Sequence, residues 1–474
     1  MDLDVCAEFG GIELGDLRLE RRAMHIVQRL SARPAHSFPK AFTSDAEREG
    51  LYRFVQNSGV TFEALISPHT RESVARCTQH DTVLVAHDTT DFTFKGEGRK
   101  GLGKVSNSSH SGQAFYGHFS VAISADGSRE PLGTLAVERW ARTGPTVSGR
   151  RKAGELSKAD VRKEKRESGR WLEGVQQVEK TLKESSATPI HLMDSEADDF
   201  ELFCRLIAQS HHFVVRGHHD RKLAEPVLGA RTIKAFVAAL PIVFEMYTPI
   251  SKRKMQQISD RKRQKGRPPR VAQLAFSSST VCLKRPRHVE EELPPDIQLN
   301  VVHVREIHPP EGQEPVDWTL FTTEPVDTDT AITRVVDFYR ARWVIEEFFK
   351  ALKTGCGFEK RQLESLHTLQ NALALFLPIA WGLLRLRTLA RDYPHLPATR
   401  SLQPLEITVL RRMGLIRAEN ALPTMREALL AIAKLGGFIK WNGEPGWLIL
   451  GRGYQELIAM VAGFKLARKR SDQS

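Results

Sequence analysis

Residues 81–94, DTVLVAHDTTDFTF, and residues 189–198, PIHLMDSEAD, decide the fold. Each contains a short apolar run typical of a buried strand, and each run leads into an acid, Asp88 in the first and Asp194 in the second. We expect both acids at the ends of their strands, where side chains open onto the edge of a sheet and ligands commonly bind. A carboxylate in this place is also a common helix cap or turn residue, so neither acid alone establishes a site.

The segments around these two runs predict a mixed α/β sheet. Residues 117–140 are typical of a hairpin with its turn at 125–127, a helix is expected at about 169–186, and FVVRG at 213–217 is a further strand. Residues from about 225 to 325 add more strand-like runs and a strongly basic segment at 252–270, which together predict a β-rich insertion. The glycine and prolines of that basic segment disfavour a regular helix there.

Both ends of the chain have helical patterns. Residues 15–30 form an amphipathic basic pattern, and Ser44 with Glu47 predicts a capping box at the start of the next helix. Such a basic helical region is either a DNA reader or a bundle with a charged surface. From residue 326 the chain is expected to be helical, with a break at 436–438. The expected domains are therefore residues 1–70, 71–370 and 371–474.

Composition limits the class of protein. The chain has 474 residues, with 69 Lys and Arg against 57 Asp and Glu, a formal net charge of +12 that suits an anionic partner such as nucleic acid. Its five cysteines form no C-x-x-C pair, which argues against a disulfide framework or zinc finger and for a reducing cytosol. The start has no signal-peptide pattern. The longest apolar run, Ala372–Leu384, falls short of the ~20 residues of a membrane span and predicts a buried helix.

A third acid lies in DFYRARWVIEEFFKALKTGCG, residues 337–357. At about 100° per residue, Tyr339, Arg342, Glu346 and Lys353 fall within one arc of a helix. The apolar residues fall on the opposite side, so we expect the four polar side chains to face away from the core. An ordinary exposed helix face would show the same pattern. Its Arg342–Glu346 ion pair, four residues apart, would stabilise the helix by only about a few tenths of a kcal/mol.

Three separated carboxylates make chemical sense together as a divalent-metal site. Phosphoryl transfer on DNA can use two hard cations, one activating water or a 3′-hydroxyl and the other stabilising the leaving oxygen. Mg²⁺ prefers oxygen ligands and keeps several waters, so a few carboxylates and a substrate phosphate can hold it. Arg342, Lys353 and Tyr339 would then bind the flanking phosphates.

The 337–357 stretch resembles the Y-(2)-R-(3)-E-(6)-K signature of bacterial insertion-sequence DDE transposases, in the group named for insertion sequence IS-four, which includes the transposase of transposon Tn-five. HDTTDFTF at 87–94 resembles that family's first-aspartate segment, and MDSEAD at 193–198 its second. Further stretches keep the family's order: YRFVQNSGVTFEAL at 52–65, FVVRG at 213–217, RKRQKGRPPR at 261–270, HPPEGQEPVDWTLFTTEPV at 308–326 and KLGGF at 434–438. The resemblance covers almost the whole chain.

The resemblance implies a ribonuclease-H-like core and Mg²⁺, with Mn²⁺ as a substitute. The implied metal ligands and catalytic residues are Asp88, Asp194 and Glu346, and the implied DNA contacts are Tyr339, Arg342, Lys353, Trp318, Arg216 and Arg170. Trp318 corresponds to the aromatic residue that stacks on a flipped-out base during hairpin formation. The family's N-terminal region helps to recognise double-stranded transposon ends, and its C-terminal helices mediate homodimerisation.

Two positions depart from the family pattern, and two alternative functions stay open. Ser195 stands where close relatives have Arg, so one basic contact is missing, and Phe349 stands where His occurs, which puts a DNA contact there in doubt. The chain could also be a ribonuclease-H-like nuclease or resolvase that cuts without joining, or an inactive DNA-binding regulator derived from a transposase. A transition-metal site at His211-His212 or His218-His219 is disfavoured because no ordered Cys or acid partners accompany them.

Overall fold

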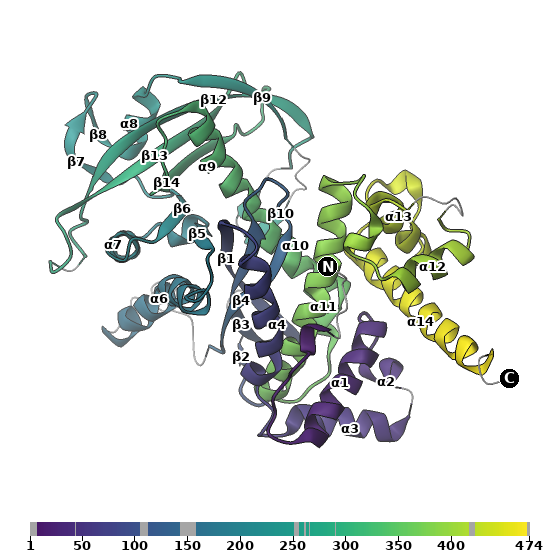
Figure 1. The fold of residues 1–474 in the computed structure, drawn as a ribbon. Helices are drawn as coiled ribbons and strands as arrows, with labels where there is room; N and C mark the ends of the chain where they lie inside the picture. The colour runs from purple at the N-terminus through teal and green to yellow at the C-terminus, as the bar shows by residue number, and fades with distance from the viewer. Residues whose placement is uncertain are drawn as a thin grey trace.

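The computed structural model describes residues 7–471, apart from 43, 105–111, 143–157, 251–255, 260–261, 265, 290 and 417–421. Figure 1 shows a large sheet flanked by helices from both ends of the chain. The expected mixed α/β architecture, with helical N- and C-terminal regions, is confirmed.

The N-terminal region is helical, as predicted. Its elements are η1 (Ala7–Phe9), α1 (Leu17–Ala32), α2 (Phe38–Ala41), α3 (Asp45–Gln56) and α4 (Phe62–Cys77). Helix α3 begins where the capping pattern placed it, because the Ser44 hydroxyl accepts a hydrogen bond from the Glu47 backbone N–H at 3.2 Å. The buried faces of α1 and α3 pack against the C-terminal half of the chain. The Asn371 amide donates to the backbone oxygens of Val55 and Val60, and the Phe38 ring stacks 6.4 Å from Phe376.

The sheet has twelve strands in one continuous hydrogen-bonded array. The strands are β1 (Thr82–Lys95), β2 (Gly103–Lys104), β3 (Gly112–Ser124), β4 (Pro131–Trp140), β5 (Thr188–Met193), β6 (His212–Arg216), β7 (Lys222–Val227), β8 (Ala230–Thr232), β9 (Phe244–Ile250), β12 (Arg270–Lys284), β13 (Asp296–Ile307) and β14 (Asp317–Thr322). Their order is β2-β3-β1-β5-β6-β14-β13-β12-β7-β8, with β4 on β3 and β9 on β12. The pairs β1–β5 and β5–β6 are parallel, and the others are antiparallel.

Most strands of the expected insertion extend this sheet, and β10 (Gln256–Ser259) and β11 (Lys262–Gln264) form a separate two-stranded sheet. β14 pairs with β6 through Leu320↔Arg216, so the strands from about residue 270 to 322 continue the core sheet beyond β6. The basic segment contributes the two short paired strands β10 and β11, and no described residue of it is helical. The rest of residues 251–265 lies outside the described part of the chain.

Helices cover the sheet, and their order matches the sequence expectation. The helices that lie between strands of the sheet along the chain are α6 (Lys158–Thr181), η2 (Ser195–Ala197), α7 (Phe200–Ala208) and α8 (Ile233–Ala239). Helix α6 begins well before the expected residue 169 and ends before 186. The C-terminal part contains α9 (Asp329–Ala341), α10 (Trp343–Lys350), the π-helical turn η3 (Ala351–Gly355), η4 (Phe358–Lys360), α11 (Leu366–Asp392), η5 (Ala398–Arg400), α12 (Pro404–Arg412), α13 (Met425–Leu435), η6 (Lys440–Asn442) and α14 (Trp447–Ser471).

Helix α11 is the central core helix of the C-terminal part. It is the one described helix long and apolar enough to cross a membrane, but 94% of its apolar window is buried inside the protein. The buried-helix prediction for residues 372–384 is therefore confirmed. The expected break at 436–438 is also present, because α13 ends at Leu435 and Gly437 adopts a positive φ.

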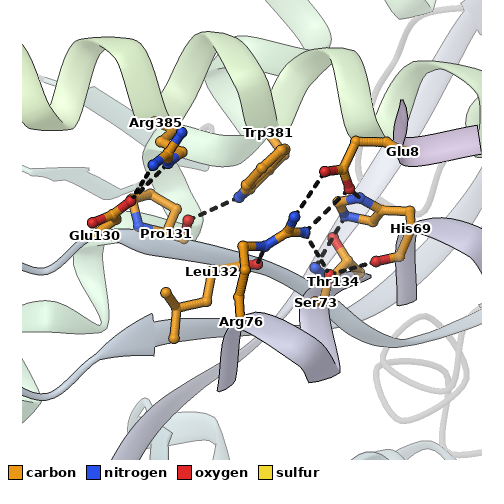
Figure 2. Close-up of polar contacts among 10 residues, drawn as sticks. All are labelled: Glu8, His69, Ser73, Arg76, Glu130, Pro131, Leu132, Thr134, Trp381 and Arg385. Carbon is orange, nitrogen blue, oxygen red and sulfur yellow. Dashed lines mark hydrogen bonds and ion pairs between the residues drawn. The ribbon is translucent and has the colours of Figure 1, made fainter. Parts of the chain in front are cut away.

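A buried polar network joins the N-terminal segment, α4, β4 and α11 (Figure 2). The Glu8 carboxylate binds the Arg76 guanidinium at 2.7 Å and His69 Nδ1 at 2.6 Å. Because the Thr134 backbone N–H donates to His69 Nε2, the imidazole proton lies on Nδ1 and is donated to Glu8. The Arg76 guanidinium also lies 4.1 Å from the centroid of the Trp381 ring.

Candidate active site

Asp88 lies on β1, and Asp194 directly follows the neighbouring parallel strand β5. The β1–β5 pairing ends at Ala86↔Leu192, and each acid lies two residues further along the chain. Asp194 still has an extended backbone, and side chains alternate along an extended chain, so both acids are expected on the side of that last pair. Asp194 follows the last residue of β5, as predicted. Asp88 lies within β1 and pairs with Phe119 of β3, so the prediction that it ends a strand is wrong.

The helix expected at 339–353 consists of three parts. Helix α9 ends at Ala341, α10 starts at Trp343, and the π-helical turn η3 carries Lys353. At Arg342 the backbone stays in the right-handed helical region, with tightened bonds from Arg342 N–H to Tyr339 and from Ile345 N–H to Arg342. A π-helical turn places Lys353 differently from a regular helix, and such turns occur often at functional sites.

The expectation that the polar residues face away from the core is wrong for Tyr339 and Arg342, whereas Glu346 and Lys353 are partly exposed. Tyr339 and Arg342 are each only 7% exposed. Ile345 and Phe348, on the apolar side, are fully buried as well. The segment therefore packs against β1 as well as α11 (Figure 1), while Trp343 and Lys350 stay exposed.

Arg342 joins the first and third acids. Its Nη1 lies 3.4 Å from Asp88 Oδ2, and its Nη2 lies 3.0 Å from Glu346 Oε1. A guanidinium has five N–H donors in a fixed plane, so it can bind two carboxylates and still offer donors to a phosphate.

The charges of the three acids act on one another. Burial raises the pKa of Asp88 to about 7, with Arg342 opposing the rise and the charges of Asp194 and Glu346 adding to it. Burial also raises the pKa of Glu346 against the effect of Arg342, and Asp194 contributes in the same direction. Burial and mutual repulsion therefore disfavour ionisation of Asp88 and Glu346, and Arg342 opposes this effect through direct contact with both.

The chemistry of these donors fits a hard divalent cation, since buried carboxylate oxygens are what Mg²⁺ binds. Their arrangement is not a closed ligand sphere: among the residues that the structure describes, no three acid, histidine or cysteine side chains lie at the spacing of ligands to one metal ion. The Arg342 guanidinium supplies the positive charge between Asp88 and Glu346 in this arrangement.

Lys353 lies beside the acids and points toward β1. Its Nζ is 3.4 Å from Asp91 Oδ1 and 3.7 Å from Glu359 Oε1, and it lies 5.5 Å from the centroid of the Phe92 ring. Sequence reasoning did not single out Asp91 or Glu359. Asp91 lies in the quoted HDTTDFTF motif, so a second acid three residues after Asp88 was an available signal, whereas nothing in the sequence marks Glu359.

The aromatic and remaining basic candidates surround the same region. The edge of the Trp318 ring on β14 meets Tyr339, with ring centroids 5.6 Å apart. Burial raises the pKa of Tyr339, while the charges of Arg342 and Arg216 oppose this rise, so both arginines lie within electrostatic reach of its hydroxyl. Arg170 of α6 forms an ion pair with Glu196, two residues after Asp194, at 2.8 Å.

Several other aromatic and histidine side chains have structural roles. Trp171 and Trp381 are core residues at 2% exposure, and Phe349 is buried with its ring centroid 5.4 Å from that of Phe119, so Phe349 offers no open surface for DNA. His211 pairs with Glu179 at 3.0 Å and His212 with Glu324 at 2.7 Å. Glu179 also binds the buried His191, which contacts His87 behind Asp88 at 2.8 Å.

Two family models match this chain. Residues 5–60 match the transposase DNA-binding model, and residues 172–379 match the transposase DDE domain model. This chain carries the domains of a DDE transposase. The second match includes Asp194 and Glu346 and begins after Asp88, which the β1–β5 pairing brings near Asp194 and which shares Arg342 with Glu346.

The DDE domain defines the class of fold and chemistry. The β4-β3-β1-β5-β6 part of the sheet, antiparallel and then parallel, is its ribonuclease-H-like core, as expected. A DDE transposase domain is of the metal-dependent polynucleotidyl transferase class, and its members generally use divalent cations. The N-terminal DNA-binding domain makes DNA the partner, in agreement with the net charge of +12.

Proposed function

We propose that this chain is a cut-and-paste DNA transposase of the IS-four group, acting in the cytosol as a homodimer on double-stranded transposon ends. The observation that carries the proposal is the meeting of Asp88 and Glu346 at one buried guanidinium, with Asp194 directly after the end of the next strand. The N-terminal helices would recognise the transposon end, residues 71–370 would perform catalysis, and the helices after residue 370 would mediate dimerisation.

In this proposal Asp88, Asp194 and Glu346 hold Mg²⁺, or Mn²⁺ in its place. When bound, the cations would activate the attacking oxygen and stabilise the leaving one. Arg342, Lys353 and Tyr339 would hold the phosphates on either side of the scissile bond, since charge-assisted hydrogen bonds to phosphate fix its position. Arg216 and Arg170 lie on neighbouring elements and would extend this contact along the DNA.

The reaction sequence follows from the family resemblance. Water attacks the phosphorus at the transposon end, the bond to the 3′ oxygen breaks, and that oxygen leaves as a 3′-hydroxyl. This hydroxyl attacks the opposite strand, which forms a hairpin and releases the flanking DNA. A second water opens the hairpin, and the 3′-hydroxyl then attacks the target DNA. Trp318 would stack on the base flipped out at the hairpin, because its ring is partly exposed beside Tyr339.

Cleavage of the DNA that flanks the coding region tests this proposal. Purified protein and Mg²⁺ should release the flank from a labelled duplex and give a strand of doubled length on a denaturing gel, which marks the hairpin. Asp194→Ala should abolish cleavage and keep DNA binding, while the control Asp327→Ala, at an exposed position, should behave as wild type. Cuts without a doubled strand or joining would favour a nuclease, and binding without cleavage would favour an inactive regulator. Unchanged cleavage by Asp194→Ala would refute the assignment of this acid.

A further inference from the structure

Glu347, the residue after the third acid, faces the C-terminal helices. Its Oε2 accepts a hydrogen bond from the Trp447 indole N–H at 3.1 Å and lies 3.0 Å from Arg387 Nη1. Its Oε1 lies 2.6 Å from Lys350 Nζ. One carboxylate of α10 is therefore bound to α11 through Arg387 and to the first residue of α14 through Trp447.

The packing holds Glu347 in a fixed orientation, because Lys350, Arg387 and the Trp447 N–H contact its carboxylate from three sides. The Arg387 guanidinium lies 4.4 Å from the centroid of the Trp447 ring, and Trp447 is 6% exposed. These contacts leave the Glu347 side chain little freedom to rotate.

The backbone of α14 also touches the turn that carries Lys353. Gly451 lies so close to the Gly355 carbonyl that a methyl group on Gly451 would overlap its oxygen. Gly355 ends the π-helical turn, which is closed by the bond from the Cys356 N–H to the Ala351 oxygen at 2.8 Å. Helix α14 therefore supports the segment from Glu346 to Lys353 at two points, the Glu347 side chain and the turn.

We infer that Glu347 is a positioning residue, through which helix α14 fixes the orientation of Glu346 and Lys353 toward the DNA phosphates and the divalent cation. This inference rests on the proposed function. Rotation of α10 by a small angle would move Glu346 relative to Asp88 on β1, and the cation site needs both. The bonds from Glu347 to Arg387 and Trp447 oppose that rotation.

The test compares Trp447→Phe, which removes the indole N–H and keeps an aromatic ring, with Trp441→Phe, the same change at a side chain that is 91% exposed. Glu347→Gln is the second variant and removes the charge with little change of shape. Binding of Mn²⁺ to the full-length protein without DNA is measured by electron paramagnetic resonance. The rate of single-turnover cleavage is measured against Mg²⁺ concentration, and affinity for the end DNA is measured separately.

For Trp447→Phe and Glu347→Gln we expect about tenfold weaker Mn²⁺ binding and a matching rise in the Mg²⁺ concentration for half-maximal rate, as for partners of metal ligands. Saturating Mg²⁺ should restore most of the rate, and DNA affinity should stay unchanged. Trp441→Phe should match wild type. If Trp447→Phe leaves Mn²⁺ binding and the Mg²⁺ dependence unchanged, the inference is wrong. If the wild-type protein neither binds Mn²⁺ nor cleaves DNA, the proposed function fails instead.

Discussion

Replacing Asp88 with asparagine should make the metal-free protein more stable at alkaline pH. Burial and the neighbouring acids raise the pKa of Asp88 from its ordinary 3.8 to about 7. The folded protein therefore keeps this proton at pH values where the unfolded chain has released it. Because the folded state binds more protons between these two values, the free energy of unfolding falls as the pH rises from about 4 to about 7. An asparagine has no such proton to lose.

The size of the effect follows from the two pKa values. Between pH 5 and pH 8 this carboxyl should lower the free energy of unfolding of the wild-type protein by about 3 kcal/mol. The Asp88 side chain is 20% exposed, so solvent screening removes only part of that value. The advantage of Asp88→Asn over wild type should thus grow by about 2 kcal/mol across this pH range. The acid would be retained for function at a cost in stability.

Urea unfolding in EDTA at pH 5, 6, 7 and 8 measures this difference, with intrinsic fluorescence as the readout. Asp327→Asn is the matched control, because the same change at an exposed residue should leave the pH dependence of wild type intact. A constant difference between Asp88→Asn and wild type over the whole range would refute the reasoning. Saturating Mg²⁺ should reduce the difference, since cation binding to the ionised carboxylates stabilises the wild-type protein alone.

Three further changes test other parts of the molecule. Glu8→Gln should destabilise the protein by about 3 kcal/mol at pH 7. Burial would raise the pKa of Glu8, but His69 and Arg76 lower it to about 2. The resulting stabilisation is present above pH 4.5 and is lost as the pH falls toward 2. Calorimetry of Glu8→Gln and of the exposed control Glu13→Gln checks this, and equal melting temperatures would contradict it. Gly451→Ala should destabilise the protein by about 1–3 kcal/mol, because the added methyl group would overlap the Gly355 carbonyl, whereas Gly463→Ala, in open space on the same helix, should stabilise the protein by up to about 1 kcal/mol. The urea concentrations at half-unfolding of the two variants measure these effects. A Gly451→Ala variant as stable as wild type would disprove the close approach. DNA affinity should fall steeply with salt, and Arg216→Ala should reduce the slope of log affinity against log salt by about one; an unchanged slope would remove that residue from the DNA contacts.

The order of elements could be predicted from the sequence because each has a local pattern. The apolar run before Asp194 ends at the acid, and the strand ends there too. The position of Asp88 could not be predicted in the same way. β1 continues to Lys95 because it pairs with β3, and that pairing joins Asp88 to Phe119, 31 residues further along the chain. Alternation of residue types does not show how far such a partner extends.

The sequence motifs identified the candidate site residues, but they did not predict how deeply those residues are buried. A helical wheel separates one polar arc from one apolar arc, so it predicted that Tyr339 and Arg342 would be exposed. The sheet packs on the polar arc, and both residues are buried. Tertiary packing of this kind places an arginine between carboxylates where its charge balances theirs, and it also makes Asp91 a partner of Lys353.

The shared core of the N-terminal helices and α11 limits how new end specificities can be engineered. The DNA-binding match ends at residue 60, which invites exchange of residues 1–60 with those of another transposase. Such a chimera would cut through one continuous hydrophobic core, because the Phe38 ring lies on Phe376 and the Asn371 amide binds the backbone of Val55 and Val60. A graft that folds must bring the facing surface of α11 with it, and Glu8 must still meet Arg76. Altered specificity is therefore more accessible by changing exposed residues of α1 and α3 than by exchanging the module.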